Sequence, residues 1–211
     1  SSSVYTGALI SQSTSSYPSI DGSNNLKIQT GQTTSLTNVV GLWHLDEASG
    51  NALDSSGLAN TGTPTGTTVV TGLFGNARSF NGTSDTITIT SGAGAPLDID
   101  TLPVTIEAWF KPTNNFSAAN QHIFSRGTVG ASGYGVLLNT TGKVNCGSHG
   151  GSNFSGATLV TTGVWHHIAC VTNGADSRLY LDGKLDGIGS VTIVANDLNA
   201  HIGSSDRKSV V

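Results

Sequence analysis

Short apolar runs, separated by turn-forming polar residues, recur about every ten positions along most of the chain. After Asp85, residues 86–90 alternate threonine with isoleucine, and residues 104–110 place Val104, Ile106 and Phe110 on one face. A period of two is the pattern of a half-buried β-strand. Further apolar runs of strand length cover residues 39–45, 67–70, 122–125, 134–138, 164–171 and 178–181. No long stretch follows the helical period of 3.6, so the pattern predicts an all-β protein.

The clearest turn signal is Asp182-Gly183, which directly follows the apolar run 178–181. This dipeptide tolerates the positive φ angles of a type I′ turn, so we expect a β-hairpin there. Strands that follow one another without intervening helices favour antiparallel pairing. The sequence therefore predicts a two-sheet antiparallel β-sandwich.

Composition narrows the class of protein further. The 211 residues include 28 glycines and only 10% charged residues, with a net charge of −4. No basic stripe is present to neutralise phosphates, which argues against a nucleic-acid partner. No apolar run approaches the ~20 residues that span a bilayer, so we expect no membrane span in this chain. Abundant Ser, Thr, Asn and Gly is typical of exported proteins, and we expect an extracellular, cell-surface or virion-surface location.

Three segments are distinguished by composition. Residues 1–36 are rich in Ser, Thr, Gln and Asn and are interpreted as a linker or as the end of a preceding module. Residues 37–205 carry the strand pattern of the sandwich. Residues 206–211 match the translation of the start of a common short-read sequencing adapter, and we interpret the chain as an internal fragment of a longer protein.

Cys146 and Cys170 are the two cysteines of the chain, and both lie in strand-like runs. Without a CxxC pair, they do not suggest a zinc site. A disulfide would follow if their strands pair. Two buried free thiols are the alternative, and the sequence does not decide between them.

Several blocks of the sequence, in order, resemble the laminin-G-like and pentraxin-like jelly-roll domains of the concanavalin A-like superfamily. The blocks are Gly41–Thr63, Phe74–Ile89, Thr105–Pro112, Gly163–Val171, Arg178–Lys184 and His201–Ser205. The resemblance implies a jelly-roll sandwich. It also implies that the last strand of the family's fold is lacking here, because the motif of that strand is not found.

The resemblance further implies a structural calcium ion near residues 54–60. Asp54 and Asn60 would supply a carboxylate and an amide oxygen, the hard oxygen ligands that Ca²⁺ prefers. The alternative is an Asx-turn without metal, in which the Asp54 carboxylate accepts hydrogen bonds from backbone amides. Both interpretations stay open at the level of sequence.

The sequence does not indicate an enzyme. Related β-glucanases carry three carboxylates at alternating positions of one strand. This chain has only two glutamates, Glu47 and Glu107, far apart in sequence, and the same-face neighbours of Glu107 are not carboxylates. Among the tryptophans, Trp43 and Trp165 are expected in the core. Trp109 alternates with polar residues and is the candidate ligand-binding side chain. His166 and His167 point to opposite faces of a strand and are expected to be structural.

These observations favour a non-catalytic binding or adhesion module of a larger secreted or surface protein. Its ligand would be a glycan or a protein on a surface. Two alternatives remain: a structural spacer or display domain, including one on a phage or virion surface, and an accessory domain of a hydrolase. Specificity in such folds lies in variable loops, so the sequence does not name the ligand.

Overall fold

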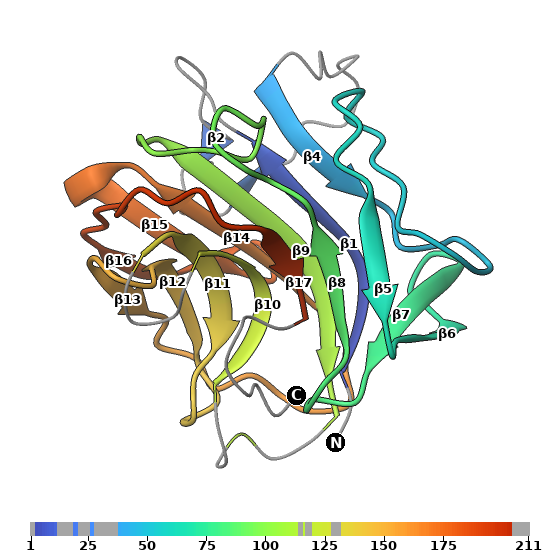
Figure 1. Ribbon diagram of the computed structural model, residues 1–211. Helices are drawn as coiled ribbons and strands as arrows, with labels where there is room; N and C mark the ends of the chain where they lie inside the picture. The colour runs from blue at the N-terminus through green and yellow to red at the C-terminus, as the bar shows by residue number, and fades with distance from the viewer. Residues whose placement is uncertain are drawn as a thin grey trace.

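The computed structural model describes residues 3–11, 19–20, 26–27, 38–113, 116, 120–127 and 132–203. The chain folds into two stacked β-sheets whose strands all pair antiparallel (Figure 1). No α-helix is found in these residues. The predicted all-β, two-sheet jelly-roll sandwich is confirmed.

The larger sheet has eight strands in the order β16-β15-β14-β9-β1-β7-β6, with β4 also paired to β1. Their bounds are β1 Ser3–Ser11, β4 Val39–Trp43, β6 Thr68–Thr71, β7 Asn76–Phe80, β9 Val104–Pro112, β14 His166–Thr172, β15 Ser177–Leu181 and β16 Lys184–Gly189. A turn of 3-10 helix, η2 Gly174–Asp176, connects β14 to β15.

The smaller sheet has seven strands in the order β13-β12-β11-β10-β17-β8-β5. Their bounds are β5 Gly62–Thr65, β8 Thr86–Ile89, β10 Gln121–Arg126, β11 Tyr134–Leu138, β12 Val144–Ser148, β13 Asn153–Ser155 and β17 Ala200–Ile202. A separate two-stranded sheet joins β2 Ser19–Ile20 to β3 Leu26–Lys27.

Strand β1 comes from residues 1–36, the segment interpreted as a linker or as the end of a preceding module. It lies between β9 and β7 in the larger sheet, with Ser3 opposite Pro112 and opposite Phe80. The place beside β9 is therefore taken by this first strand. The division into domains and the lack of a last strand stay predictions, and residues 206–211 lie outside the described part of the chain.

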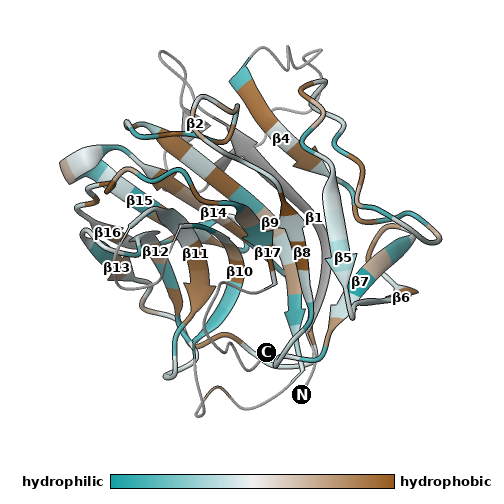
Figure 2. Ribbon diagram, in the orientation of Figure 1, coloured by the Kyte–Doolittle hydropathy of each residue, from teal (hydrophilic) through white to brown (hydrophobic). Residues whose placement is uncertain are grey.

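The core lies between the two sheets and is built from the strand side chains that point inward. In β9 every second side chain is buried, from Val104 to Phe110, and Figure 2 shows the matching stripes of hydropathy. Trp43 is fully buried and stacks on Phe124, as expected for a core residue. Trp165 was predicted in the core, but this is wrong. It precedes β14, is only half-buried, and lies under the Lys111 ammonium, 5.6 Å from the ring centroid.

A disulfide joins the two sheets through the core. Cys146 of β12 and Cys170 of β14 are bonded, with their Cα atoms 5.8 Å apart. The two strands belong to different sheets, so the bond forms across the sandwich and not between paired strands. This decides between the two alternatives that the sequence left open.

The predicted hairpin is confirmed at the edge of the larger sheet. Strands β15 and β16 pair with Leu181 opposite Lys184. The two turn residues, Asp182 and Gly183, have φ angles of 51° and 77°. Both are positive, as a type I′ turn requires.

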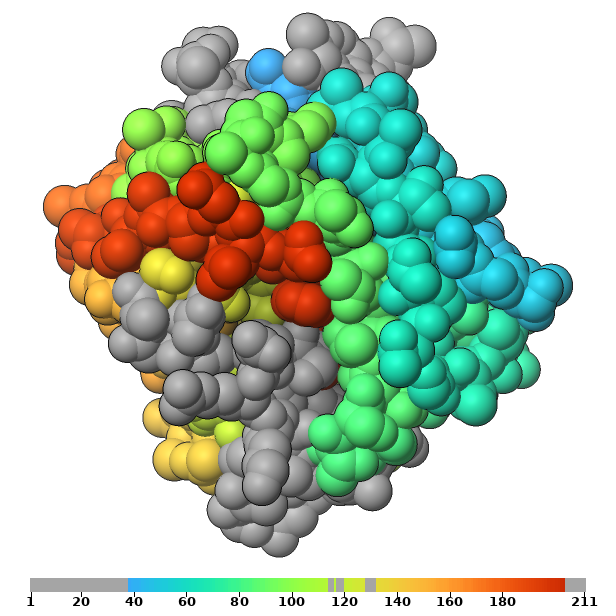
Figure 3. All heavy atoms as spheres, in the orientation of Figure 1, coloured from blue at the N-terminus to red at the C-terminus, as the bar shows by residue number. Residues whose placement is uncertain are grey.

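Two long segments lie side by side on the sandwich: the segment that connects β8 to β9, and the segment that runs from the end of β16 through β17. Figure 3 shows the second in red beside the first in green. The backbone N–H of Ser91 donates to the Asn199 side chain at 3.1 Å. Below them, the fully buried Arg126 forms an ion pair with Asp98 at 2.6 Å. A buried charge requires such a partner, so this pair holds the segment between β8 and β9, which carries Asp98, on strand β10 of the smaller sheet.

Candidate binding groove

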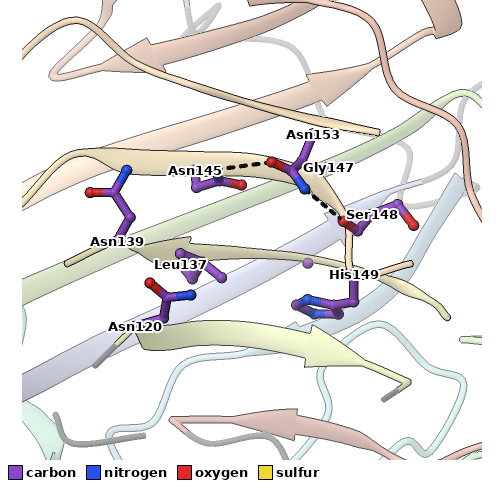
Figure 4. A pocket seen from close by; sticks show the side chains of 9 residues that line it. Asn120, Leu137, Asn139, Asn145, Gly147, Ser148, His149 and Asn153 are labelled. Carbon is purple, nitrogen blue, oxygen red and sulfur yellow. Dashed lines mark hydrogen bonds between the residues drawn. The ribbon is translucent and has the colours of Figure 1, made fainter. Parts of the chain in front are cut away.

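A cavity of about 200 Å³ lies on the outward face of the smaller sheet (Figure 4). Because successive strand residues point to opposite faces, Val136 and Leu138 of β11 enter the core while Leu137 between them faces outward. Strand β12 repeats this pattern, with Val144 in the core and Asn145 outward. The cavity is lined by Asn120, Gly135, Leu137, Asn139, Asn145, Gly147, Ser148, His149 and Asn153.

Asparagine dominates this groove, and its four members differ in how far their amides are engaged. Asn139 Oδ1 accepts hydrogen bonds within its own turn, from the backbone N–H groups of residues 141 and 143 and from the hydroxyl of residue 141. Asn145 donates to Asn153 Oδ1 at 3.2 Å, and Asn153 donates to a backbone carbonyl. The Asn120 amide has no hydrogen-bond partner within the described part of the chain, and it is exposed. As far as the described residues extend, both ends of the Asn120 amide are therefore open to a ligand.

The opposite end of the groove is formed by the turn that follows β12. Ser148 donates its hydroxyl to the Gly133 carbonyl at 2.7 Å and accepts from the backbone N–H of Gly151 at 2.9 Å. These bonds hold the turn against β11, and the next side chain, His149, extends over Gly135. A Cβ atom at Gly135 would lie 2.7 Å from His149 Nε2, so the ring lies where only glycine leaves room.

A second histidine packs against the first from β10. His122 lies opposite Leu137 in the strand register, and its ring centroid is 5.2 Å from that of His149. Burial lowers the pKa of His122 to about 3, and repulsion from a protonated His149 contributes in the same direction. Burial also lowers the pKa of His149 to about 4. Both rings are therefore neutral at neutral pH, and each can donate one hydrogen bond and accept another.

The chemistry of the lining residues is polar and uncharged. Amides, a hydroxyl and a neutral imidazole surround one apolar side chain, Leu137. Such a surface can donate hydrogen bonds to hydroxyl groups and accept from them, while Leu137 contacts an apolar face. A polyhydroxylated, uncharged molecule matches the amides, the hydroxyl and the apolar side chain of this lining. The groove was not predicted from the sequence, although polar positions alternate with core residues 144 and 146 and were a usable signal.

The residues predicted to hold calcium lie elsewhere, in the loop after β4. The Asp54 carboxylate accepts four hydrogen bonds: on Oδ1 from the backbone N–H groups of Leu42 and Ser56, and on Oδ2 from the Ser56 hydroxyl and the Asn60 backbone N–H. Desolvation raises the pKa of Asp54, but these hydrogen bonds outweigh it and hold the pKa below its ordinary value. The Asn60 side chain donates to the Val40 carbonyl at 2.7 Å.

Donors surround Asp54 where a calcium ion would need further oxygen ligands, so this loop does not fit a calcium ion as it stands and has the geometry of the Asx-turn alternative. Within the described residues no group of three His, Cys, Asp or Glu side chains could hold a metal ion. Calcium binding at Asp54 and Asn60 stays a prediction.

Trp109, the predicted ligand-binding residue, lies on β9 of the larger sheet and not in the groove. Its half-buried ring meets the exposed ring of Phe74 edge-on, with the centroids 6.2 Å apart. On its other side lies His167, with a centroid distance of 5.1 Å. A ligand role for Trp109 stays a prediction.

The remaining candidate groups are engaged in separate local contacts. Glu47 accepts from the Leu53 backbone N–H, and Glu107 lies 3.7 Å from His167. His166 bonds Asp182 at 2.8 Å and packs on the core ring of Phe110, whereas His167 packs on Trp109 of the outer face. The two histidines thus point to opposite faces, as predicted from their adjacency.

The comparison with known sequences finds one family. A model of the concanavalin A-like lectin/glucanases superfamily matches residues 81–209. No curated protein sequence matches the chain significantly. Among the described residues no helix is long and apolar enough to cross a membrane.

Several solved structures share the fold. Domain 4 of AbnA, a GH43 extracellular arabinanase from Geobacillus stearothermophilus in complex with arabinotriose, has a TM-score of 0.56 and 19% identity over 74% of this chain and 80% of that one. A sialidase from Trypanosoma rangeli has a TM-score of 0.61 and 14% identity over 92% of this chain and 32% of its own. Botulinum neurotoxin type C follows at 0.51 and 13%, over 74% of this chain and 41% of its own. At these identities the likeness concerns the fold alone, and the chain spans less than half of the last two proteins.

Proposed function

Since the chain belongs to the concanavalin A-like lectin/glucanases superfamily, we propose that it is a non-catalytic carbohydrate-binding domain of a secreted or surface protein. Its ligand is a neutral glycan bound in the groove of the smaller sheet. The observation that carries the proposal is the groove itself, which joins amides and an apolar floor on an open sheet face.

The groove offers the two kinds of contact that a sugar needs. Asn120 and Asn145 present amides that can donate to and accept from hydroxyl groups, and Leu137 offers an apolar surface to the C–H face of a sugar ring. With several polar groups converging on one cavity, a bound hydroxyl can replace the water that hydrates them.

Two of the proteins that share the fold support a carbohydrate ligand. The arabinanase domain was solved with arabinotriose, and the neurotoxin is described as interacting with two ganglioside molecules. The sialidase is an enzyme, so the fold by itself does not separate binding from catalysis. Support for a non-catalytic role comes from the two glutamates, which are engaged by separate partners and do not line the groove.

The disulfide supports a location outside the cytosol. Disulfides such as Cys146–Cys170 persist in oxidising compartments and are rare where thiols are kept reduced. We therefore place the domain in a secreted or surface protein. A spacer or display role and an accessory role beside a hydrolase would use the same location.

The test is binding of the full chain to an array of neutral oligosaccharides that includes arabinotriose, followed by calorimetry with any sugar that binds. We expect saturable binding that Asn120→Ala weakens at least about tenfold, the loss of one or two ligand hydrogen bonds. Because Asn120 has no partner in the described part of the chain, its replacement should leave the melting temperature unchanged. Asn51→Ala, at an exposed asparagine outside the groove, is the matched control and should bind like the parent.

Three results would redirect the assignment. Binding to none of the glycans would favour the spacer or display role. Binding that Asn120→Ala leaves intact but Trp109→Ala abolishes would move the ligand to the larger sheet. Release of new reducing ends from a bound oligosaccharide would show catalysis and contradict the non-catalytic proposal.

A further inference from the structure

The imidazole of His149 has a buried nitrogen that its surroundings do not explain. Nε2 has no hydrogen-bond partner within the described residues and no contact with solvent. The backbone of His149 is fixed, since its N–H donates to the Gly133 carbonyl at 3.3 Å and the preceding Ser148 is held on β11. A buried polar atom without a partner normally indicates a water molecule or an ion.

This nitrogen lies over the neighbouring strand and not over β12. His149 follows β12, yet Nε2 lies over Gly135 of β11, where any side chain would collide with it. On the far side of β11 is β10, which carries His122 on the same outward face. A histidine of β10 and a histidine of the turn after β12 therefore meet above a glycine of β11, the strand between them.

The separation of the two rings matches a shared metal ion. A Zn–N bond of about 2.0–2.1 Å places a metal roughly 3.2 Å from the centroid of each ligating ring. Two such rings at a tetrahedral angle have centroids about 5.2 Å apart. The centroids of His122 and His149 are 5.2 Å apart, and the ring planes are inclined by 49°.

The ligand type also suits a metal. Neutral imidazole is the form that ligates metal ions. Nitrogen ligands favour Zn²⁺ and Cu²⁺ over Ca²⁺ and Mg²⁺, which prefer oxygen.

We propose that His122 and His149 bind a first-row divalent cation of the Zn²⁺ or Cu²⁺ class. The cation lies between the two rings at the end of the groove, above Gly135. Water from the adjoining cavity fills the remaining coordination positions, because the described residues that line the cavity include no carboxylate or thiolate. This site is separate from the Asp54 loop and does not depend on carbohydrate binding.

The experiment uses the untagged full chain, freed of metal with a chelator and then dialysed at pH 7.5. Zn²⁺ is titrated in by calorimetry, and Cu²⁺ by the visible absorption band of copper bound to imidazole. We expect one equivalent of either ion to bind and to raise the melting temperature, with Cu²⁺ binding more tightly than Zn²⁺. His149→Ala should lose the saturable binding and the thermal shift, with a loss of at least about tenfold in affinity.

His44→Ala is the matched control, because His44 is exposed and does not line the cavity. It should bind both ions like the parent. Circular dichroism checks that the His149 variant is folded. His122 is almost fully buried, so His122→Gln is informative only through the same pair of measurements on folded protein. Absence of saturable binding by the parent up to about 1 mM metal, or equal binding by the His149 variant, would overturn the proposal and leave an ordinary contact between two neutral rings.

Discussion

Replacing Asp54 with asparagine tests how the first loop of the sandwich is stabilised. The change keeps the shape of the side chain but turns one of the two oxygens into an N–H donor. In the native loop each oxygen accepts two hydrogen bonds, at distances from 2.7 to 2.9 Å. The variant must therefore point an N–H₂ group at a backbone N–H that has no other acceptor.

The expected loss follows from the hydrogen bonds. One stranded, partly buried backbone N–H costs about 1–2 kcal/mol, and the remaining bonds weaken because the acceptor is no longer charged. The Ser56 hydroxyl can turn to water, so its bond is discounted. We expect Asp54→Asn to lower the free energy of unfolding by about 2 kcal/mol.

The assay is urea unfolding followed by tryptophan fluorescence. Trp43 reports the loop directly, because its indole Nε1 donates to the Asn60 carbonyl at 2.8 Å. Asp46→Asn is the control, since Asp46 is exposed and its carboxylate takes part in no hydrogen bond within the described residues. A loss for Asp54→Asn within about 0.5 kcal/mol of the control would refute the reasoning, because surface changes have effects of that size.

The same variant also tests how the stability of the loop depends on pH, and whether the loop binds calcium or is an Asx-turn without metal. The pKa of Asp54 is lowered on folding, so its stabilisation is complete above the ordinary aspartate pKa and is lost as the pH falls below it. The parent should therefore lose more stability than Asp54→Asn below about pH 4. Weak extracellular calcium sites are tested at about 1–5 mM Ca²⁺. A rise in the melting temperature of the parent at this concentration, absent from the variant, would establish a calcium site at Asp54.

Three further predictions concern other parts of the molecule. Reduction of the disulfide, which closes a 24-residue separation, should lower the free energy of unfolding by about 3–4 kcal/mol; a reductant that leaves the urea midpoint unchanged would show that the bond contributes nothing. His122 and His149 have a pKa of about 6.5 in the unfolded chain and of about 3 and about 4 in the folded protein. In metal-free protein each should therefore lower the free energy of unfolding by about 2 kcal/mol at pH 5 relative to pH 8, because at pH 5 only the unfolded chain takes up the proton. His149→Gln should show a shallower dependence of stability on pH than the parent. Gly183→Ala should cost about 1 kcal/mol because its φ is 77°, whereas Gly92→Ala, with open space around it, should be neutral in the same melting experiment.

The strands could be predicted from sequence because each carries its own evidence. The alternation in residues 104–110 survives intact in β9, and Asp182-Gly183 adopts the turn that its residue types favour. Such signals are local, so they need no knowledge of neighbouring elements. Trp165 was placed wrongly because it lies just before a strand, where its ring instead packs under the Lys111 ammonium.

The sites could not be predicted in the same way because they depend on how the sheets stack. Cys146 and Cys170 meet across the core although their strands do not pair. His122 and His149 meet because β11 between them carries glycine at position 135. Neither contact follows from spacing along the chain. For the groove, the only usable sequence signal was the alternation in β12, which indicates the polar side chains that face outward from the sheet.

The position of β1 also affects the order in which the protein can form. The larger sheet has two halves, β16-β15-β14-β9 and β7-β6, and β1 is the strand that connects them. During synthesis β1 therefore waits about a hundred residues for β9, since Ser3 pairs with Pro112. Until β9 is synthesised, one edge of β1 has no partner and can pair with another chain. Slow, long-range closure of this sheet should therefore govern both the folding rate and the yield of soluble protein.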